Sequence, residues 1–216
     1  MKALICLLSL LVLMTCRNEI QSINIELKSD KLISESFNDQ EIQELGKIIY
    51  FFESQIRKEV SEFGVKKSYQ EFLKRDSLRC IKENEMYWFD YEEQKKLYIN
   101  LEPTFFNNFW IKAKRIVNPG GEKEFEYDYY ALKVYNEKGL SRYAMFLSNL
   151  SKENKFIKKY FTTCKVTNSF LNPTTPISLT INHINFNKED IKIRLIYSFH
   201  YININEEYKF FQKKQL

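Results

Sequence analysis

The stretch IKIRLIYSFHYI, residues 191–202, decides the fold class of this chain because it fits two periodicities at once. Its odd-numbered positions are all apolar, and alternation at period two is typical of a half-buried β-strand. The same stretch also carries an apolar stripe at helical spacing, formed by Ile191, Leu195, Phe199 and Ile202. A strand here gives an α+β domain, whereas a helix gives a mainly α domain.

The residues before this stretch fit both structures. Asn187 to Asp190 would form the turn of a second, C-terminal β-hairpin. Thr175 and Pro176 are instead a good N-cap and first-turn pair for a helix, and Asn187 would cap a further helix with Asp190 at its third position. The residues alone leave 176–205 open between helix and strand.

Further upstream, a long amphipathic helix is predicted. Its apolar residues recur at spacings of three and four, with Asp39 as the expected cap and Gly64 as the expected stop. Glu53 and Arg57 are expected to pair across one turn of its exposed face. The apolar stripe consists of Ile42, Leu45, Ile49, Phe52, Ile56, Val60 and Phe63.

Local signals predict four more helices and one hairpin. Ser68 to Glu71 form a capping box, so one helix is expected to start at Ser68, and Ser141 is expected to cap another. The turn signal Asn118-Pro119-Gly120-Gly121 predicts a β-hairpin. The helices are expected at residues 68 onward, 91–101, 141–150 and 153–161, and the strands at residues 111–117 and 125–135. The aromatic pairs at residues 105–106 and 109–110 have helical spacing and are expected in the core.

The N-terminus has the pattern of a secretory signal. Lys2 precedes an apolar run from Ala3 to Met14, which is short for a membrane-spanning helix. The tetrapeptide Leu13-Met14-Thr15-Cys16 resembles a bacterial lipobox, in which the cysteine is lipidated and becomes the first residue of the mature protein. The alternatives are a secretory signal cut nearby and an uncleaved anchor.

The lipobox resemblance implies a division of the chain into three parts. Residues 1–15 are expected to be the signal peptide, and residues 16–38 a lipidated N-terminus and tether, since residues 19–38 are polar with scattered apolar positions. Residues 39–216 are expected to form a single globular domain. The protein would then be anchored in a membrane of the cell envelope through its N-terminal lipid.

The last third of the chain resembles a second pattern. Residues 193–205, with residues 143–150 and 154–160, look like a pattern in Bacteroidetes lipoproteins whose function is unknown. Those sequences are richer in helix formers, so the resemblance implies helices in this third and carries no activity with it. We therefore expect a mainly α fold, a helical single domain with a small β-hairpin. An α+β domain with a second C-terminal hairpin is the alternative.

Charge and cysteine content bound the function classes. The 33 basic and 28 acidic residues are spread without long same-sign blocks, which gives no reason to invoke nucleic acid as a partner. If Cys16 is lipidated and Cys6 leaves with the signal, Cys80 and Cys164 remain. They form either a disulfide, which would stabilise the fold by roughly 4 kcal/mol, or two buried reduced thiols. Neither has a histidine nearby in sequence, which argues against a catalytic cysteine.

Few residues offer a catalytic or metal-binding constellation. His183 and His200, with Glu189 and Asp190, would make a metal site or the catalytic groups of a hydrolase, but their spacing matches no known ligand motif. A glycan-directed enzyme of this kind would use Tyr127, Tyr129 and Tyr130 as a stacking surface. The acidic cluster Asp90, Glu92 and Glu93 lies on one helix, where neighbours do not face each other across a sugar.

The sequence thus favours a non-enzymatic lipoprotein of the bacterial cell envelope, on its periplasmic or outer-membrane face. We expect it to bind an envelope protein, or a glycan or other cell-wall polymer, without a cofactor or metal. A glycan-directed or metal-dependent hydrolase is the alternative.

Overall fold

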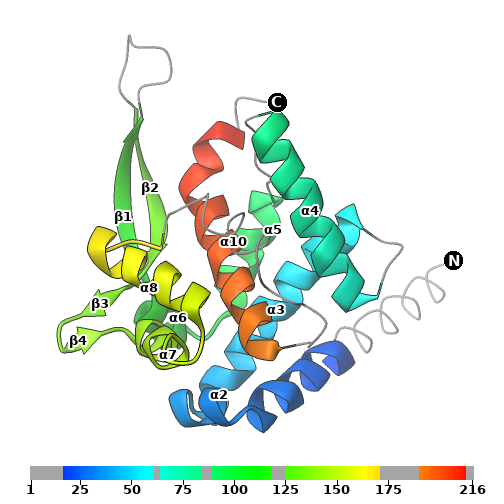
Figure 1. Ribbon diagram of the computed structural model, residues 1–216. Helices are drawn as coiled ribbons and strands as arrows, with labels where there is room; N and C mark the ends of the chain where they lie inside the picture. Colours follow the sequence, from blue (N-terminus) through cyan, green and yellow to red (C-terminus); the bar gives the residue numbers. More distant parts are fainter. Residues whose placement is uncertain (1–16, 61–63, 84–88, 118–124, 171–189, 213–216) are drawn as a thin grey trace, which may run out of the picture.

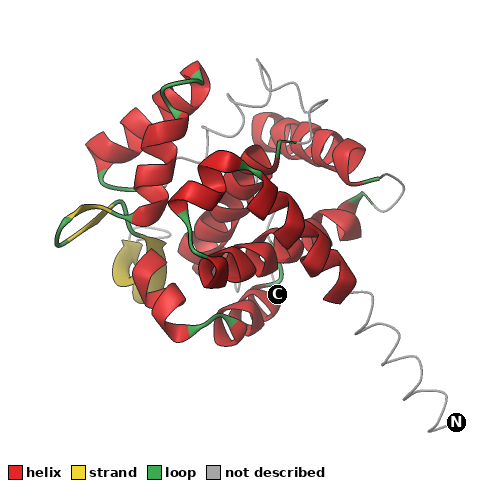
Figure 2. Cartoon of the chain, turned by 90° about the horizontal axis from the view of Figure 1, so that it is seen from below, coloured by secondary structure: helices red, strands yellow, loops and turns green. Residues whose placement is uncertain are grey.

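Helix α10 (Ile191–Gln212) runs through the middle of the molecule, and the other elements pack around it (Figure 1). In this computed structural model the described residues are 17–60, 64–83, 89–117, 125–170 and 190–212. α10 packs against α3 (Asp39–Glu59), α5 (Tyr91–Asn100) and β2 (Phe125–Leu132). Helices make up most of the described chain and the strands lie at one side (Figure 2). The mainly α fold with a small β-hairpin is confirmed.

The stretch of the C-terminal third that fitted both a helix and a strand is a helix from Ile191 onward. The alternative C-terminal hairpin is therefore wrong for residues 191–205. Of its predicted turn, Asn187 to Asp190, residues 187–189 lie outside the described residues. The physical reason is burial: apart from Lys192, every residue from Ile191 to Glu207 is buried. A helix covered on all sides needs no single apolar stripe, so its sequence periodicity is a weak signal. Asp190, and not Asn187, caps the helix, because its carboxylate accepts a hydrogen bond from the Lys192 amide (3.0 Å).

Helix α3 confirms the long amphipathic helix with small changes at both ends. Its N-cap is Asn38 rather than Asp39: Asn38 accepts from the Glu41 amide (2.9 Å), and Glu41 accepts from the Asn38 amide (2.9 Å). The helix ends before Val60, ahead of the predicted stop at Gly64. Asp39 instead forms an ion pair with Lys28 (2.8 Å).

Helix α4 (Val65–Glu83) begins three residues before the predicted capping box. Ser68 lies buried in its first turn, where its amide donates to the Gly64 carbonyl (3.0 Å). The inner side of this helix carries Tyr69, Phe72 and Leu73, which are all buried. They join an aromatic cluster whose rings come from three helices and from the segment before α5: Phe52, Tyr69, Phe72, Phe89 and Tyr201.

The predicted hairpin is confirmed as β1 (Trp110–Val117) paired antiparallel with β2. Its turn, residues 118–124, lies outside the described residues. α10 covers the far edge of β2: Asn203 accepts from the Leu132 amide (2.9 Å) and Glu206 from the Tyr130 amide (3.1 Å). These two side chains satisfy backbone donors that would otherwise lie unpaired at a sheet edge.

The remaining elements complete both sides of α10. α5 follows its cap Asp90 and ends at Asn100, one residue before the predicted end, and α6 (Pro103–Phe109) brings Phe105 and Phe109 into the core. β3 (Tyr135–Asn136) and β4 (Gly139–Leu140) form a short ladder that leads into α7 (Arg142–Leu150), capped by Ser141 as predicted. α8 (Lys155–Thr167), capped by Asn154, begins two residues later and ends six residues later than predicted.

The described chain is packed from its N-terminal end, which differs from the expected tether. Residues 17–29 are helical and are followed by α2 (Lys31–Ser36). Their apolar side chains belong to the central core: Ile23, Leu27, Ile33 and Phe37. Gly46 of α3 permits the close crossing, because a Cβ built there would lie 1.9 Å from Asn24 Oδ1. The packed body therefore extends upstream of residue 39. Among the described helices, none is long and apolar enough to cross a membrane.

Candidate functional site

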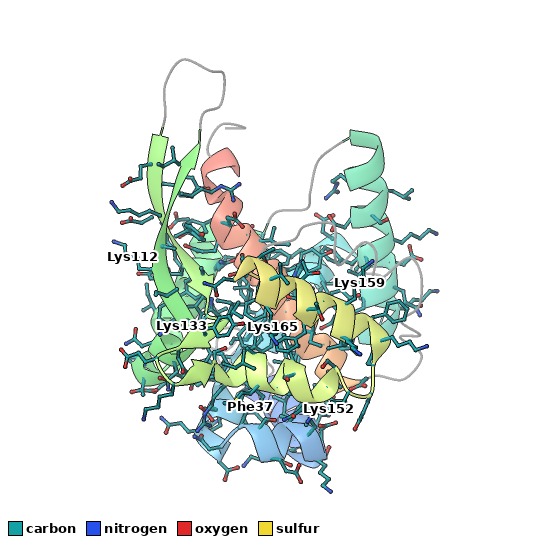
Figure 3. The ribbon with its side chains drawn as sticks, turned by 60° about the vertical axis from the view of Figure 1, so that its left-hand side comes forward. Phe37, Lys112, Lys133, Lys152, Lys159 and Lys165 are labelled. Atoms are coloured by element: carbon teal, nitrogen blue, oxygen red, sulfur yellow. The ribbon has the colours of Figure 1, made fainter. Side chains whose placement is uncertain are left out.

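The most distinctive surface of the molecule is a row of lysines on α8 and the turn before it. We call it the α8 basic face, formed by Lys152, Lys155, Lys158, Lys159 and Lys165, all of them exposed. Figure 3 shows Lys152, Lys159 and Lys165 on one face of the molecule, together with Lys133 and Lys112 of the neighbouring hairpin region. Over the 10 residues from Lys155 to Lys165 an α-helix rises about 15 Å, so the charges form an elongated row.

This face accounts for the net charge of the chain. Residues 141–170 contain six basic residues and one acidic residue, Glu153, so their formal charge is +5. The whole chain has 33 basic and 28 acidic residues, which leaves 27 of each sign outside this segment. The formal charges of the rest of the chain therefore sum to zero, and residues 141–170 carry a charge equal to the net charge of the whole chain.

The lysines of the α8 basic face have no carboxylate partner among the described residues. The ammonium groups of Lys155, Lys158 and Lys159 make no hydrogen bond or ion pair there, and Lys152 donates to the Asn149 amide oxygen (2.9 Å). Lys165 lies over the ring of Phe161, 5.6 Å from its centroid. Lysines elsewhere are commonly paired, as in Lys28–Asp39, Lys58–Glu93, Lys95–Glu92, Lys112–Asp128 and Lys192–Asp30.

The positive charges on α8 disfavour the helix that carries them. Lys155 lies three and four residues before Lys158 and Lys159, and like charges at these spacings each destabilise a helix by about 0.2–0.5 kcal/mol. The first turn holds no acidic residue to complement the positive end of the helix dipole. A sequence arrangement that opposes local stability is typical of a functional surface.

The inner side of α8 is buried in the core. Ile157, Tyr160, Phe161 and Cys164 are buried, α8 packs against α7, and Tyr160 contacts His200 of α10. On the outer side Val166 is 82% exposed. α8 is thus fixed to the body by its apolar side and presents its lysines to solvent.

The histidine that sequence analysis proposed as a catalytic or metal-binding group lies directly beneath this face. His200 is 2% exposed, and its Nδ1 is 3.3 Å from the Tyr160 hydroxyl. Burial lowers the pKa of His200 to about 3, so the ring is neutral across the physiological range. Burial also raises the pKa of the neighbouring Cys164 thiol to about 12. A protonated, enclosed thiol beside a neutral histidine has the properties of core packing rather than of a nucleophile and its base.

Of the two cysteines predicted to pair, only one has a described side chain. Cys164 is buried and forms no disulfide with a described residue, whereas the side chain of Cys80 in α4, its predicted partner, is not among those described. The disulfide between Cys80 and Cys164 stays a prediction, as does the lipidation of Cys16, which lies outside the described residues.

The other proposed metal or catalytic groups are not brought together. His183 and Glu189 lie outside the described residues. Asp190 caps the start of α10, ten residues before His200, which is about 15 Å along the helix. Within the described ranges, no group of three or more His, Cys, Asp and Glu side chains is arranged to hold a metal ion.

The acidic cluster and the tyrosines have structural partners. Asp90 caps α5, Glu92 pairs with Lys95 (2.7 Å), and Glu93 accepts from Lys58 (2.5 Å) and Gln55 (2.7 Å). The hydrogen bond from Lys58 is the main reason that the pKa of Glu93 is lowered. Tyr130 packs against Tyr98 and Phe106, whereas Tyr127 and Tyr129 contact each other, so the three tyrosines do not form one stacking surface.

The α8 basic face was not predicted from the sequence, because its lysines do not form a same-sign block in the linear chain. The signal was present in residues 152–165, where five lysines accompany a single glutamate. Only the structure shows that these lysines lack carboxylate partners while other lysines have them. No family model, no curated protein and no solved structure matches this chain.

Proposed function

We propose that this protein is a non-enzymatic binding module of the bacterial cell envelope, lipid-anchored at Cys16, that contacts an anionic partner through the α8 basic face. The observation that supports the binding role is the row of exposed lysines without carboxylate partners on α8. Such a row raises the local concentration of anionic partners and speeds their association.

The lipobox-like tetrapeptide Leu13-Met14-Thr15-Cys16 supports the anchor. Several acyl chains on one cysteine, each methylene contributing about 0.8 kcal/mol, would hold the protein in the membrane essentially permanently. The chain is helical and packed soon after Cys16, since Ile23 and Leu27 already lie in the core. An anchored body would therefore sit close to its membrane.

The hydrolase alternative has less support. It requires His200 to reach a substrate or metal, yet this side chain is buried under α8 with a strongly lowered pKa. Its partner Asp190 lies about three helical turns away. No observation on the described residues favours this alternative over the binding role.

The anchor is tested by metabolic labelling. Cells that express the full chain and grow on an alkyne palmitate analogue are expected to label the protein at Cys16, and the Cys16→Ala variant is expected to remain unlabelled. Labelling that persists in the variant would exclude Cys16 as the site of lipidation.

The binding role is tested with three substitutions on α8. In the full chain, Lys155→Gln, Lys158→Gln and Lys159→Gln together are expected to weaken binding to fluorescent heparin, used as a generic polyanion, by about 100-fold at low salt, or about five-fold per lysine. The melting temperature is expected to stay the same or rise, because the substitutions remove like-charge repulsion within the helix. Fluorescence anisotropy and circular dichroism measure the two quantities.

A matched control separates the face from net charge. Lys28→Gln, Lys58→Gln and Lys95→Gln remove the same charge from exposed lysines that already have carboxylate partners. This control is expected to weaken heparin binding only a few-fold. Equal losses in both triple variants would contradict a specific role for α8.

A further inference from the structure

We infer that the partner of the α8 basic face is a linear polyanion, with repeated phosphate or carboxylate groups, that lies along α8 on the side of the molecule away from the anchor. This inference rests on the proposed function and specifies its partner. Three observations carry it: the kind of cation on the face, the shape of the row, and its position relative to the start of the described chain.

The cations on the face are all lysines. A lysine is a compact point charge on a flexible stem, whereas arginine presents a rigid fork that recognises one phosphate or carboxylate in a defined geometry. The nearest arginine in the sequence, Arg142 at the start of α7, already forms an ion pair with Glu41. Lysine is also depleted at the centres of protein–protein interfaces. The composition therefore favours recognition of charge density along a polymer over a tight contact with a folded protein.

The shape of the row matches an extended ligand. Lys155, Lys158 and Lys159 lie within about one turn of α8, Lys152 precedes them and Lys165 follows almost two turns later. The face is the outer side of a helix, so a ligand must lie across it or along it. A polymer that follows α8 reaches all five lysines, whereas a small anion reaches one or two.

The position of the face separates it from the membrane that holds the anchor. In Figure 1, α8 lies at the left of the molecule, and the dark-blue start of the helical segment 17–29 lies at the lower right. α7 lies between α8 and α2, since it packs against both. The apolar side of α8 is buried in the core, which leaves no apolar stripe to insert into a bilayer. An anchored body would therefore present α8 to the space beyond its own membrane.

The inference is tested with polymers of defined length. The full chain, purified in a neutral detergent, is titrated with fluorescent poly-L-glutamate and with inorganic polyphosphate, each in a graded series of chain lengths. Affinity is expected to rise with length until the polymer spans the lysine row, and to level off after that. For long chains, the slope of log K against log salt is expected to be about −3 to −4, and flatter by about 2 in the Lys155, Lys158 and Lys159 triple glutamine variant.

Each arm of the experiment has a distinct meaning. Tighter binding to one of the two polymers identifies phosphate or carboxylate as the preferred group, and either result supports the inference. Affinity that is independent of polymer length would overturn it in favour of a small anion. The chain is also anchored in phosphatidylcholine vesicles and mixed with separate vesicles that contain phosphatidylglycerol. Clustering of these vesicles, without polymer binding, would assign the face to a membrane surface instead.

These outcomes are distinguishable from failure of the proposed function. If the triple glutamine variant binds heparin as well as the unmodified chain does, the anionic-partner role itself fails. If it loses heparin binding but the length series is flat, the role stands and the linear polyanion is excluded.

Discussion

Lowering the pH from 7 to 4 is expected to destabilise the protein by about 3 kcal/mol through His200 alone. The folded protein holds this histidine neutral, because burial lowers its pKa to about 3. In the unfolded chain a histidine takes up a proton near pH 6.5. Between pH 6.5 and pH 3 the unfolded state therefore binds more protons at this site, so the free energy of unfolding falls by about 1.4 kcal/mol per pH unit.

The sign of this effect follows from the direction of the shift. A base with a lowered pKa contributes its full stability above pH 6.5 and loses it as the pH falls toward 3. Above pH 7 both states hold the ring neutral, so no dependence on pH is expected from His200 there. Nε2 makes no hydrogen bond with the described residues, so a protonated ring would bury a charge without an acceptor at this nitrogen.

The measurement is urea unfolding from pH 8 to pH 4 of the unmodified protein and of His200→Gln. Glutamine does not titrate and keeps a polar group opposite the Tyr160 hydroxyl. Carboxylates titrate alike in both proteins, so the difference between their free energies of unfolding isolates His200. We expect this difference to be constant above pH 7. By pH 4 the unmodified protein is expected to have lost about 3 kcal/mol of stability relative to the variant. Parallel curves over the whole range would show that His200 is protonated in the folded protein.

The elements that the sequence predicted correctly are those whose cause is local. Ser141 caps α7 because its hydroxyl accepts from the Ala144 amide (3.2 Å), three residues later. The β1–β2 pairing follows from a four-residue turn signal between two β-prone segments. In both cases the interaction that fixes the structure lies within a short window of sequence, so pattern and structure agree.

The errors share a different cause, which is contact between distant parts of the chain. The sequence predicts a polar tether at residues 19–38, yet Leu27 and Ile33 are completely buried against the rest of the core. The ambiguity of α10 has the same origin, because helices and strands from the whole chain cover it on every side. An amphipathic pattern requires one exposed face, so a helix that is buried on all sides does not show it.

The candidate site was likewise predictable from the sequence only in part. The lysines of α8 were visible in sequence, and their exposure follows from helical periodicity once α8 is placed. What local sequence does not supply is the pairing state. Lys58 has a partner at Glu93, 35 residues away, whereas Lys158 has none among the described residues. Charge pairing over such separations depends on tertiary structure, so only the structure distinguishes a row of unpaired lysines from a neutralised surface.

The pairing of Glu53 is the clearest case and leads to the second large expected effect. From its spacing, Glu53 was predicted to pair with Arg57 on an exposed face. That prediction is wrong: Glu53 is only 5% exposed, and Arg194 of α10 contacts it with Nε and Nη2, each 2.7 Å from Oε1. Tyr69 donates a further hydrogen bond to the same oxygen (3.0 Å), and Arg57 pairs with Glu19 instead (2.8 Å).

Arg194→Met is therefore expected to lower the free energy of unfolding by about 3–5 kcal/mol at pH 7, because it leaves a buried carboxylate without its cation. Burial already raises the pKa of Glu53, and without Arg194 the carboxyl group is expected to become protonated in the folded state. The double variant Arg194→Met and Glu53→Met removes both charges and is expected to recover much of the loss. Glu26, the second partner of Arg194, is 45% exposed in its side chain and remains solvated without it.

Arg57→Met is the matched control, because it removes the cation that the sequence assigned to Glu53. Its ion pair with Glu19 is partly exposed at both ends, so we expect a loss of no more than about 1 kcal/mol. Urea unfolding of the three variants at pH 7 compares the two pairings directly. A large loss of stability for Arg57→Met with a small one for Arg194→Met would support the Glu53–Arg57 pair that was predicted from the sequence. The opposite order would show that α3 and α10 are joined by a buried charge pair, whose two residues are 141 positions apart in the sequence.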